Sequence, residues 1–238
     1  MADASFPRHV VVTGAAGALG RAVVQQFLGQ GARLALVDHR LAHLASTFPG
    51  LDNSQHLLLE ADVTSAEAMA GAGQRILATL GGQVDALVHI AGGFEMGEPV
   101  HALGRAAWDR MMNLNAWSFV AVTQALVPAM IERKAGRVVA VSAKTAARGA
   151  AAMAAYIASK SALQRLVESL SREVRGAGIN VNSIAPSVLD TPANRRDMPD
   201  TDPARWVSTG SAARMVSMLA SDAAASVHGQ HLVLDGLS

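Results

Sequence analysis

Short, continuous apolar runs alternate along this chain with longer segments of helical composition. The runs have the length and the β-branched or leucine-rich content of buried strands, at residues 9–13, 33–37, 56–60, 85–90, 136–141, 179–184 and 231–234. Predicted helices lie between them, at residues 18–30, 39–48, 65–80, 105–133, 153–175 and 204–220. Strands that are apolar throughout are typical of a parallel sheet covered on both faces. We therefore expect an α/β fold with a doubly wound, Rossmann-like parallel sheet of about seven strands.

The chain shows no internal repeat and no linker that would divide its 238 residues. That length lies within the range of one α/β domain, so we expect a single domain over residues 1–238. The one irregular polar segment, residues 194–202, follows the sixth predicted strand. Doubly wound sheets bind ligands at the carboxyl ends of their strands. We therefore expect a substrate-loop region around residues 190–206, with the polar segment as a lid.

The composition excludes several classes of protein. Half of the residues are hydrophobic and only 16% are charged, which is not the composition of a disordered chain. Twenty basic residues against nineteen acidic ones leave a net charge of +1, so we expect no nucleic-acid partner. There is no cysteine for a thiolate metal site or a nucleophile. His39 and His43 share a metal-binding spacing but lack a third ligand, so we expect no metal.

One uncharged stretch, residues 111–131, is long enough to span a bilayer. It contains asparagine, serine, threonine, glutamine and proline residues, which argue instead for a buried helix of a soluble protein. The first nine residues lack the long apolar stretch of a signal peptide. We therefore expect a cytoplasmic protein without a membrane partner.

The first predicted strand runs directly into a glycine-rich turn that opens a helix. Gly14, Gly17 and Gly20 recur there at intervals of three residues, with Leu19 before the last of them. This spacing lets the backbone turn tightly and approach a pyrophosphate, and the helix amino terminus supplies N–H donors. Asp38 ends the second predicted strand, where a carboxylate can accept hydrogen bonds from the ribose hydroxyls of adenosine. Together these features predict a dinucleotide site.

The residues around the same carboxylate indicate which dinucleotide binds. Asp38 would repel a 2′-phosphate, which favours NAD(H) over NADP(H). His39 and Arg40 follow immediately and weaken that repulsion. We therefore expect NAD(H) as the favoured cofactor, with NADP(H) as the possible alternative.

The single tyrosine of the chain, Tyr156, stands four residues before Lys160. Positions i and i+4 share one face of a helix, so the phenol and the ammonium can point into one cleft. A tyrosine that transfers a proton near neutral pH needs its pKa lowered from ~10 to about 7, or about 4 kcal/mol. One ammonium about 4 Å away supplies about that much at an effective dielectric of about 20. On its own the spacing is typical of a solvated helix face; beside a dinucleotide turn it predicts a proton-transferring site.

These residues resemble the short-chain dehydrogenase/reductase family over nearly the whole chain. The matching stretches are residues 13–20, 62–63, 91–92, 108–115, 180–186, 191, 229–230 and 235–236. The resemblance implies an NAD(P)-dependent oxidoreductase in which Tyr156 is the acid/base and Lys160 assists it, with Asn115 behind the lysine. It also implies a set of cofactor contacts: Gly14, Gly17, Leu19, Gly20, Asp38, Asp62, Val63, Ala91, Gly92, Tyr156, Lys160, Pro186 and Thr191.

The chain also departs from the family's pattern. His89 and Ile90 replace the two asparagines of its Asn-Asn-Ala-Gly motif. The family's catalytic serine lies 13 residues before the tyrosine, and that position is Ala143. Ser142 is adjacent, but neighbouring residues on a strand point to opposite faces, so its catalytic role is doubtful unless the strand is bulged. Thr145 is the other hydroxyl that could reach the cleft.

One branch of the family, the dihydropteridine reductases, also lacks that serine. Residues 91–94, 143–146 and 189–199 resemble this branch. The resemblance implies possible reduction of a quinonoid dihydropterin by NADH, since a conjugated imine-type acceptor needs a hydride and a proton but no oxyanion clamp. An ordinary alcohol or ketone dehydrogenase that uses Ser142 or Thr145 is the alternative. A non-catalytic NAD(H)-binding sensor or scaffold is the alternative from another class of protein.

The partner of the site is expected to be a small-molecule substrate. Residues beside the motifs are candidates for lining its pocket: Phe94, Met96, Ala143, Met153, Leu189 and Trp206. The apolar helices at residues 111–131 and 153–170 resemble the pair that forms a four-helix subunit interface in this family. We therefore expect a homodimer or a homotetramer.

Overall fold

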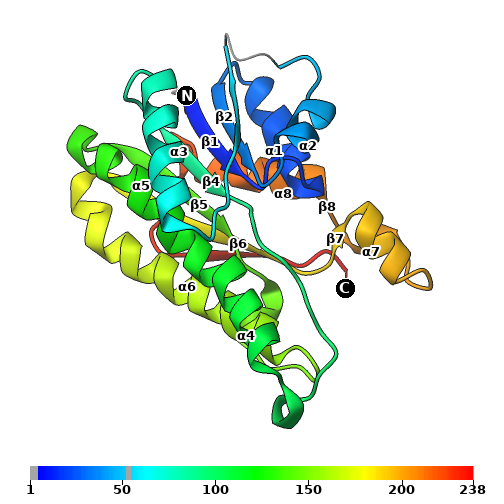
Figure 1. The fold of residues 1–238 in the computed structure, drawn as a ribbon. Coiled ribbons are helices and arrows are strands. Elements are labelled where there is room, and N and C mark those ends of the chain that lie inside the picture. The colour runs from blue at the N-terminus through cyan, green and yellow to red at the C-terminus, as the bar shows by residue number, and fades with distance from the viewer. Residues whose placement is uncertain (1–4, 52–54, 238) are drawn as a thin grey trace.

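The structure is a computed structural model that describes residues 5–51 and 55–237. Residues 1–4, part of the stretch considered for a signal peptide, lie outside it. Within the described ranges seven parallel strands form one sheet in the order β3-β2-β1-β4-β5-β6-β9 (Figure 1). The strands are β1 (His9–Thr13), β2 (Arg33–Asp38), β3 (Leu57–Glu60), β4 (Ala86–His89), β5 (Gly136–Val141), β6 (Ile179–Pro186) and β9 (His231–Leu234). The predicted doubly wound fold is confirmed, because the strand order reverses between β1 and β4.

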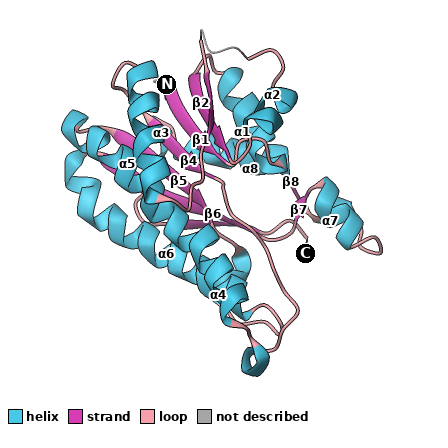
Figure 2. Cartoon of the chain, in the orientation of Figure 1, coloured by secondary structure: helices cyan, strands magenta, loops and turns pink. Residues whose placement is uncertain are grey.

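Helices cover both faces of this sheet (Figure 2). One face carries α1 (Ala18–Leu28), α2 (Leu41–Thr47) and α8 (Thr209–Leu219). The other carries α3 (Ala66–Thr79), α5 (Ser118–Arg133) and α6 (Ala154–Val174). A further helix, α4 (Arg105–Met112), packs against α6 beyond the sheet edge. Because both faces are covered, successive residues of one strand are buried in different core clusters.

The central strand β1 shows how this works. Val10 and Val12 pack in the cluster under α1 and α8, and Val11 packs in the cluster under α3, α5 and α6. All three side chains are fully buried. A strand with two covered faces has no solvent side, so its sequence is apolar without alternation. That is why the apolar runs located the strands to within two residues at each end.

The helical stretch predicted over residues 105–133 is present, but one turn within it is not α-helical. A π turn at Asn113–Trp117 separates α4 from α5. Ser118 helps to define it by donating from its hydroxyl to the Leu114 carbonyl at 2.6 Å. Single π turns inside α-helices are frequent at functional sites, since the extra residue changes which side chain points inward. Here the inward side chain is that of Asn115, which is 1% exposed.

The segment after β6 is more ordered than the sequence indicated. Residues 194–202 were expected to be irregular, but α7 (Pro192–Asp197) includes the first four of them. Thr191 starts this helix by accepting a hydrogen bond from the Asn194 N–H, and Pro192 fits its first turn. The predicted start of the last helix at residue 204 is also wrong. A short parallel pair, β7 (Leu189–Asp190) with β8 (Val207–Ser208), precedes α8.

By length and composition, residues 105–133 form one helical stretch apolar enough to cross a membrane. Buried residues make up 56% of its most apolar window. The helical stretch packs against the sheet and against α3 and α6. It therefore contributes to the core of the fold.

Candidate active site

The carboxyl ends of β1, β2 and β4 meet at one edge of the sheet, and the glycine turn lies there. Gly14 has a φ of +67°, and a Cβ on it would lie 2.7 Å from the Ala91 nitrogen. A Cβ on Gly20 would lie 2.3 Å from the Gly14 oxygen. No side chain fits at either position. The backbone therefore folds closely against the residues that follow β4.

The amino end of α1 is open to an anion. Gly17 precedes the helix without any side-chain cap, and its first turn holds no acidic residue. A Cβ on Gly17 would meet only the Gly14 oxygen, at 3.4 Å. Unpaired N–H groups and the helix dipole favour a phosphate at such an end. The turn thus fits the pyrophosphate of a dinucleotide.

Asp38 ties the end of β2 to this turn. Its Oδ2 accepts a hydrogen bond from the Ala16 N–H at 3.1 Å, and its Oδ1 accepts one from the His39 N–H at 2.9 Å. The His39 ring nitrogen Nδ1 lies 2.8 Å from the same Oδ1. Each carboxylate oxygen has two lone pairs, so the group keeps capacity for a ribose hydroxyl. The side chain is 7% exposed and firmly oriented.

The other predicted cofactor contacts follow the carboxyl ends of neighbouring strands. After β3, Asp62 is exposed and accepts from the Thr64 N–H at 2.8 Å, while Val63 is buried. Pro186 ends β6 as a buried residue, and Thr191 caps α7. The fold therefore brings these residues to the same edge as the glycine turn (Figure 1).

Tyr156 and Lys160 lie one turn apart on α6, as the spacing predicts. Lys160 is 5% exposed, and its Nζ donates to the Val141 carbonyl oxygen at 2.8 Å. Burial lowers the pKa of Lys160 to about 8. The ammonium is thus bonded to the end of β5 and carries a proton at neutral pH.

The pKa of Tyr156 differs from the expectation. Burial raises it to about 12, whereas we expected Lys160 to lower it. The phenol packs edge-on against the Phe94 ring, with ring centroids 4.9 Å apart and planes at 80°. Desolvation disfavours the charged tyrosinate, and the Lys160 ammonium is bonded elsewhere. In this geometry Tyr156 is therefore held protonated.

Asn115 joins the loop after β4 to α6. Its Oδ1 accepts from the Gly93 N–H at 2.9 Å, and its Nδ2 donates to the Gly93 oxygen and to the Ser159 Oγ, each at 3.0 Å. Ser159 in turn donates to the Tyr156 carbonyl at 2.7 Å. A Cβ on Gly92 would lie 2.8 Å from the Asn115 Oδ1 and 3.1 Å from the Lys160 Nζ. Asn115 and Lys160 therefore both crowd Gly92, which only a glycine permits.

No hydroxyl replaces the missing serine on the strand itself. Ala143 is 5% exposed and follows the end of β5. Ser142 is 3% exposed and donates from its Oγ to the Lys160 carbonyl at 3.3 Å, so in this structure its hydroxyl is bonded to the backbone of α6. Thr145 lies in the short helix at Lys144–Ala147 and is half-buried. In the described part of the chain its hydroxyl makes no hydrogen bond.

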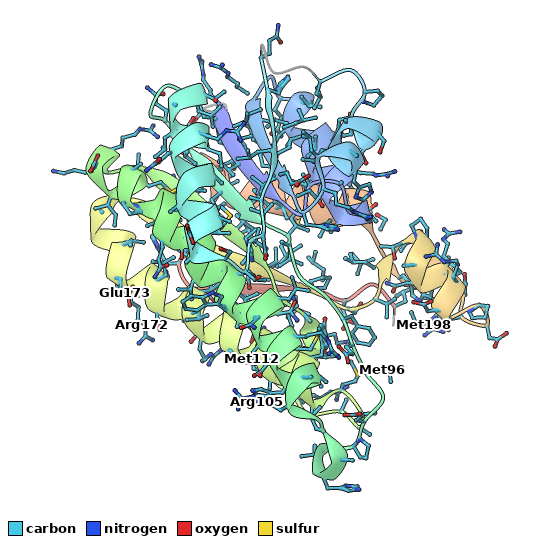
Figure 3. The ribbon with its side chains drawn as sticks, viewed as in Figure 1. Met96, Arg105, Met112, Arg172, Glu173 and Met198 are labelled. Atoms are coloured by element: carbon cyan, nitrogen blue, oxygen red, sulfur yellow. The ribbon has the colours of Figure 1, made fainter. Side chains whose placement is uncertain are left out.

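The predicted pocket residues divide into three groups. Phe94 and Met96 are exposed on the loop after β4, at 58% and 57%, and Met96 faces the region between that loop and α7 (Figure 3). Met153 and Leu189 are half-buried. Trp206 is only 5% exposed, and its Nε1 has no partner among the residues that the structure describes. The side chain is therefore enclosed at the position directly before β8, and its place in the pocket lining stays a prediction.

The sequence reasoning missed one polar residue of this region. His89 was noted only as a departure from a motif, yet it is buried at the end of β4 and bonded through both ring nitrogens. A histidine that ends an otherwise apolar strand was the available signal. Across residues 5–51 and 55–237, no three His, Asp or Glu side chains gather closely enough to hold a metal ion.

Known proteins share this arrangement of elements. The family model described as short chain dehydrogenase matches residues 8–202. The cyclopentanol dehydrogenase of Comamonas testosteroni is 33% identical over 239 residues, which cover 95% of each chain. The D-threitol dehydrogenase of Mycolicibacterium smegmatis is 30% identical over 237 residues, 95% of this chain and 90% of that one.

A solved structure extends the likeness to three dimensions. The short-chain type dehydrogenase/reductase from Mycobacterium ulcerans superposes with a TM-score of 0.89 at 26% identity. The match covers 97% of this chain and 89% of that one. With the dinucleotide turn at the carboxyl edge of the sheet, these matches show that the chain belongs to the short-chain dehydrogenase/reductase family of oxidoreductases.

Proposed function

We propose that this oxidoreductase transfers a hydride between a nicotinamide cofactor and a small substrate, with Tyr156 as the acid/base group. The observation that carries the proposal is the joint placement of Tyr156, Lys160 and Asn115 beside the glycine turn. Tyr156 and Lys160 share one face of α6, and Asn115 is bonded to Ser159 on the same helix. When bound, the cofactor supplies or accepts the hydride. The residues of the chain then have to hold the substrate and move one proton at the Tyr156 oxygen.

The residues that would hold the cofactor are those around the glycine turn. The open amino end of α1 suits the pyrophosphate, and Asp38 suits the adenosine ribose. Val63 offers an apolar wall beside the adenine, and Asp62, Ala91, Gly92, Pro186 and Thr191 complete the set. We propose NAD(H) as the favoured partner, because a 2′-phosphate beside the buried Asp38 carboxylate would be repelled. NADP(H) is the second candidate, since His39 is bonded to that carboxylate and Arg40 follows it.

The proton chemistry sets a requirement on Lys160. Tyr156 has a pKa of about 12, so at neutral pH it is protonated, as a proton donor has to be, but it is a weak acid and almost no tyrosinate is present to act as a base. For the reverse reaction its pKa has to fall, by about 1.4 kcal/mol for each tenfold gain in tyrosinate. An ammonium that shifts from the Val141 carbonyl toward the phenol would lower it. In the unperturbed geometry the populated form of Tyr156 is therefore the protonated one, which is the form that reduction requires.

The substrate class follows from the alanine at the serine position. Ketone reduction gains from a second donor on the developing oxyanion, and losing one such donor costs about 10² to 10³ in rate. Because Ala143 has no hydroxyl, we propose Tyr156 alone as the hydrogen-bond donor to the substrate. A conjugated imine-type acceptor such as a quinonoid dihydropterin needs only a hydride and a proton. The exposed Phe94 ring beside Tyr156 could pack against such a planar substrate.

An alcohol or ketone substrate is the second candidate. Thr145 is half-buried beside Ala143, and its hydroxyl is not engaged by any described residue. The family relatives with alcohol dehydrogenase names also favour this candidate. A rotated Thr145 hydroxyl would supply the second donor that Ser142 does not.

A substrate panel separates the candidates. NADH oxidation is measured with quinonoid dihydropterin and with cyclopentanone, for the wild-type protein, Tyr156→Phe and Thr145→Val. Pterin turnover that Thr145→Val leaves within twofold supports the first candidate. Cyclopentanone turnover that Thr145→Val abolishes supports the second. If neither substrate turns over but NADH binds tightly, the non-catalytic sensor or scaffold becomes the better account.

The surface of the paired helices supports a proposal about assembly. A groove of about 510 Å³ lies between α6 and the π turn with the adjoining ends of α4 and α5, and it is lined mainly by apolar side chains. Trp117 lies in this groove and is 43% exposed, and Ile131 farther along α5 is 44% exposed. A second copy of the chain would cover this face in a homodimer or homotetramer. Light scattering tests this, with Ala162→Arg expected to give monomers.

Two further expectations belong to the same proposal. Residues 190–206, with α7 and the β7–β8 pair, would form the substrate loop over the carboxyl edge of the sheet. A soluble oxidoreductase of small molecules would work in the cytoplasm. Limited proteolysis with and without NADH tests the first point, because ligand closure should protect the bonds near Arg195 and Arg196.

A further inference from the structure

His89 is fully enclosed at the carboxyl end of β4. The residue is 1% exposed, and its ring meets the Phe119 ring edge-on, with centroids 5.9 Å apart. Its Nδ1 lies 2.9 Å from the Thr13 Oγ1, and its Nε2 lies 3.1 Å from the Ser118 Oγ. Both ring nitrogens are therefore bonded, each to a residue from a different element.

The directions of these bonds follow from the neighbours. The Ser118 hydroxyl donates its proton to the Leu114 carbonyl at 2.6 Å, so it can only accept from His89. The Nε2 of His89 must then carry the ring proton, and Nδ1 accepts from the Thr13 hydroxyl. Burial and the nearby Lys160 ammonium lower the pKa of His89 to about 3, so the ring is neutral near pH 7. A single tautomer satisfies every member of the chain of bonds.

One end of this chain of bonds lies beside the dinucleotide turn, and the other lies in the helical stretch that carries Asn115. Thr13 ends β1 and directly precedes Gly14 of the dinucleotide turn. Leu114 precedes Asn115 in the π turn, and Ser118 begins α5 directly after that turn. Asn115 itself is bonded to Ser159, which donates to the Tyr156 carbonyl. His89 therefore joins the residue before the dinucleotide turn to the π turn that carries Asn115.

We propose that His89 is a positioning residue, which holds the π turn and so fixes Asn115 and the Tyr156 environment relative to the end of β1. The inference rests on the roles proposed above for Tyr156, Lys160 and Asn115. A residue at position 89 that bonds to only one of Thr13 and Ser118 would leave the π turn free to shift. The Asn115 amide would then lose alignment with Gly93 and Ser159, and water would reach the phenol.

The single tyrosine of the chain makes this testable without a substrate. Absorbance at 295 nm reports ionisation of Tyr156 alone in the folded protein. We expect His89→Leu to lower the Tyr156 pKa measurably from about 12 toward 10, because hydration favours the tyrosinate. His89→Gln keeps a donor near Ser118 and should recover part of the change. Ser118→Ala breaks the same link from its other end, so it should shift the pKa in the same direction.

The matched control is the histidine that starts β9. His231 is also bonded through both ring nitrogens, to the Ser183 Oγ at 2.7 Å and to the Glu168 Oε1 at 3.0 Å. It lies on the edge strand β9, three strands away from β4, and its two bonded partners belong to β6 and α6 rather than to the dinucleotide turn or the π turn. His231→Leu should leave the tyrosine titration and turnover unchanged, although it removes comparable bonds.

Turnover gives the second readout, as NADH oxidation with quinonoid dihydropterin. We expect His89→Leu to lower kcat about tenfold or more while KM for NADH stays within about twofold, since the glycine turn keeps its own bonds. The double variant His89→Leu with Ser118→Ala should be no worse than either single one. Folded His89→Leu with a wild-type tyrosine titration overturns the inference, whether or not the pterin is a substrate. Turnover that survives Tyr156→Phe would instead overturn the proposed function.

Discussion

A methyl group on Gly92 is the smallest perturbation that reaches the proposed catalytic groups. Its Cβ would lie 2.8 Å from the Asn115 Oδ1 and 3.1 Å from the Lys160 Nζ. Ordinary contact begins at about 3.5 Å, so the Asn115 side chain has to move by about 0.7 Å. Gly92 does not have a positive φ, so the backbone itself tolerates alanine. The strain of Gly92→Ala therefore falls on Asn115 and Lys160.

The size of the effect follows from the bonds that Asn115 makes. The side chain is 1% exposed and holds bonds to the Gly93 N–H, the Gly93 carbonyl and Ser159, at 2.9, 3.0 and 3.0 Å. Disturbing one buried hydrogen bond costs about 1–3 kcal/mol. If the same free energy is lost from the alignment of the reacting groups in the transition state, kcat falls by about 5- to 150-fold.

The assay compares Gly92→Ala with Gly71→Ala. Gly71 is exposed within α3, and a Cβ there meets nothing within 4 Å. Gly71→Ala should therefore raise the free energy of unfolding by about 0.5–1 kcal/mol and leave kcat unchanged. NADH binding by fluorescence separates an effect on cofactor affinity from one on kcat. A folded Gly92→Ala protein with kcat within twofold of wild type would refute the reasoning.

Three further predictions test neighbouring parts of the account. Ala143→Ser should raise the rate of cyclopentanone reduction at least about tenfold, because it restores a hydrogen-bond donor to the developing oxyanion. The rate with quinonoid dihydropterin should stay within twofold of wild type, and an unchanged rate with cyclopentanone would contradict the prediction. Burial lowers the pKa of Lys160 to about 8 in the folded protein, against 10.5 for an exposed lysine. Between these two pH values the unfolded chain binds more protons than the folded protein, so the free energy of unfolding rises with pH. Urea unfolding of wild type should gain about 2 kcal/mol from pH 7.5 to 9.5, and Lys160→Met should lose that gain. Asp38→Ala should weaken NADH binding about tenfold and leave NADPH binding unchanged or tighter; equal losses for both would be evidence against Asp38 as the selecting residue.

The strands were predictable because each is buried on both faces. Continuous apolar runs such as residues 136–141 have no alternative partner but a covered sheet, and β5 begins and ends at those residues. The glycine turn was predictable for a similar reason, since close backbone approaches leave room only for hydrogen at Gly14 and Gly20. Local sequence therefore determines the frame of the site.

The features that the sequence did not reveal all depend on distant partners. The π turn leaves the apolar pattern of residues 105–133 intact, so nothing local marks it. The β7–β8 pair involves two residues on each side, too few for a pattern. His89 is bonded to residues 76 and 29 positions away, so its role emerges only when β1, β4 and α5 are packed together. The pKa of Tyr156 was also missed, because helix spacing cannot show that Lys160 bonds to Val141.

The central claim is that Tyr156 transfers the proton while other residues bind the cofactor. Its most direct test measures NADH affinity and NADH oxidation with quinonoid dihydropterin for Tyr156→Phe beside wild type. We expect turnover to fall by about 10² to 10⁴ and the NADH dissociation constant to stay within a few-fold of the wild-type value, because the phenol oxygen is the proton donor. A Tyr156→Phe protein that oxidises NADH at the wild-type rate would contradict it.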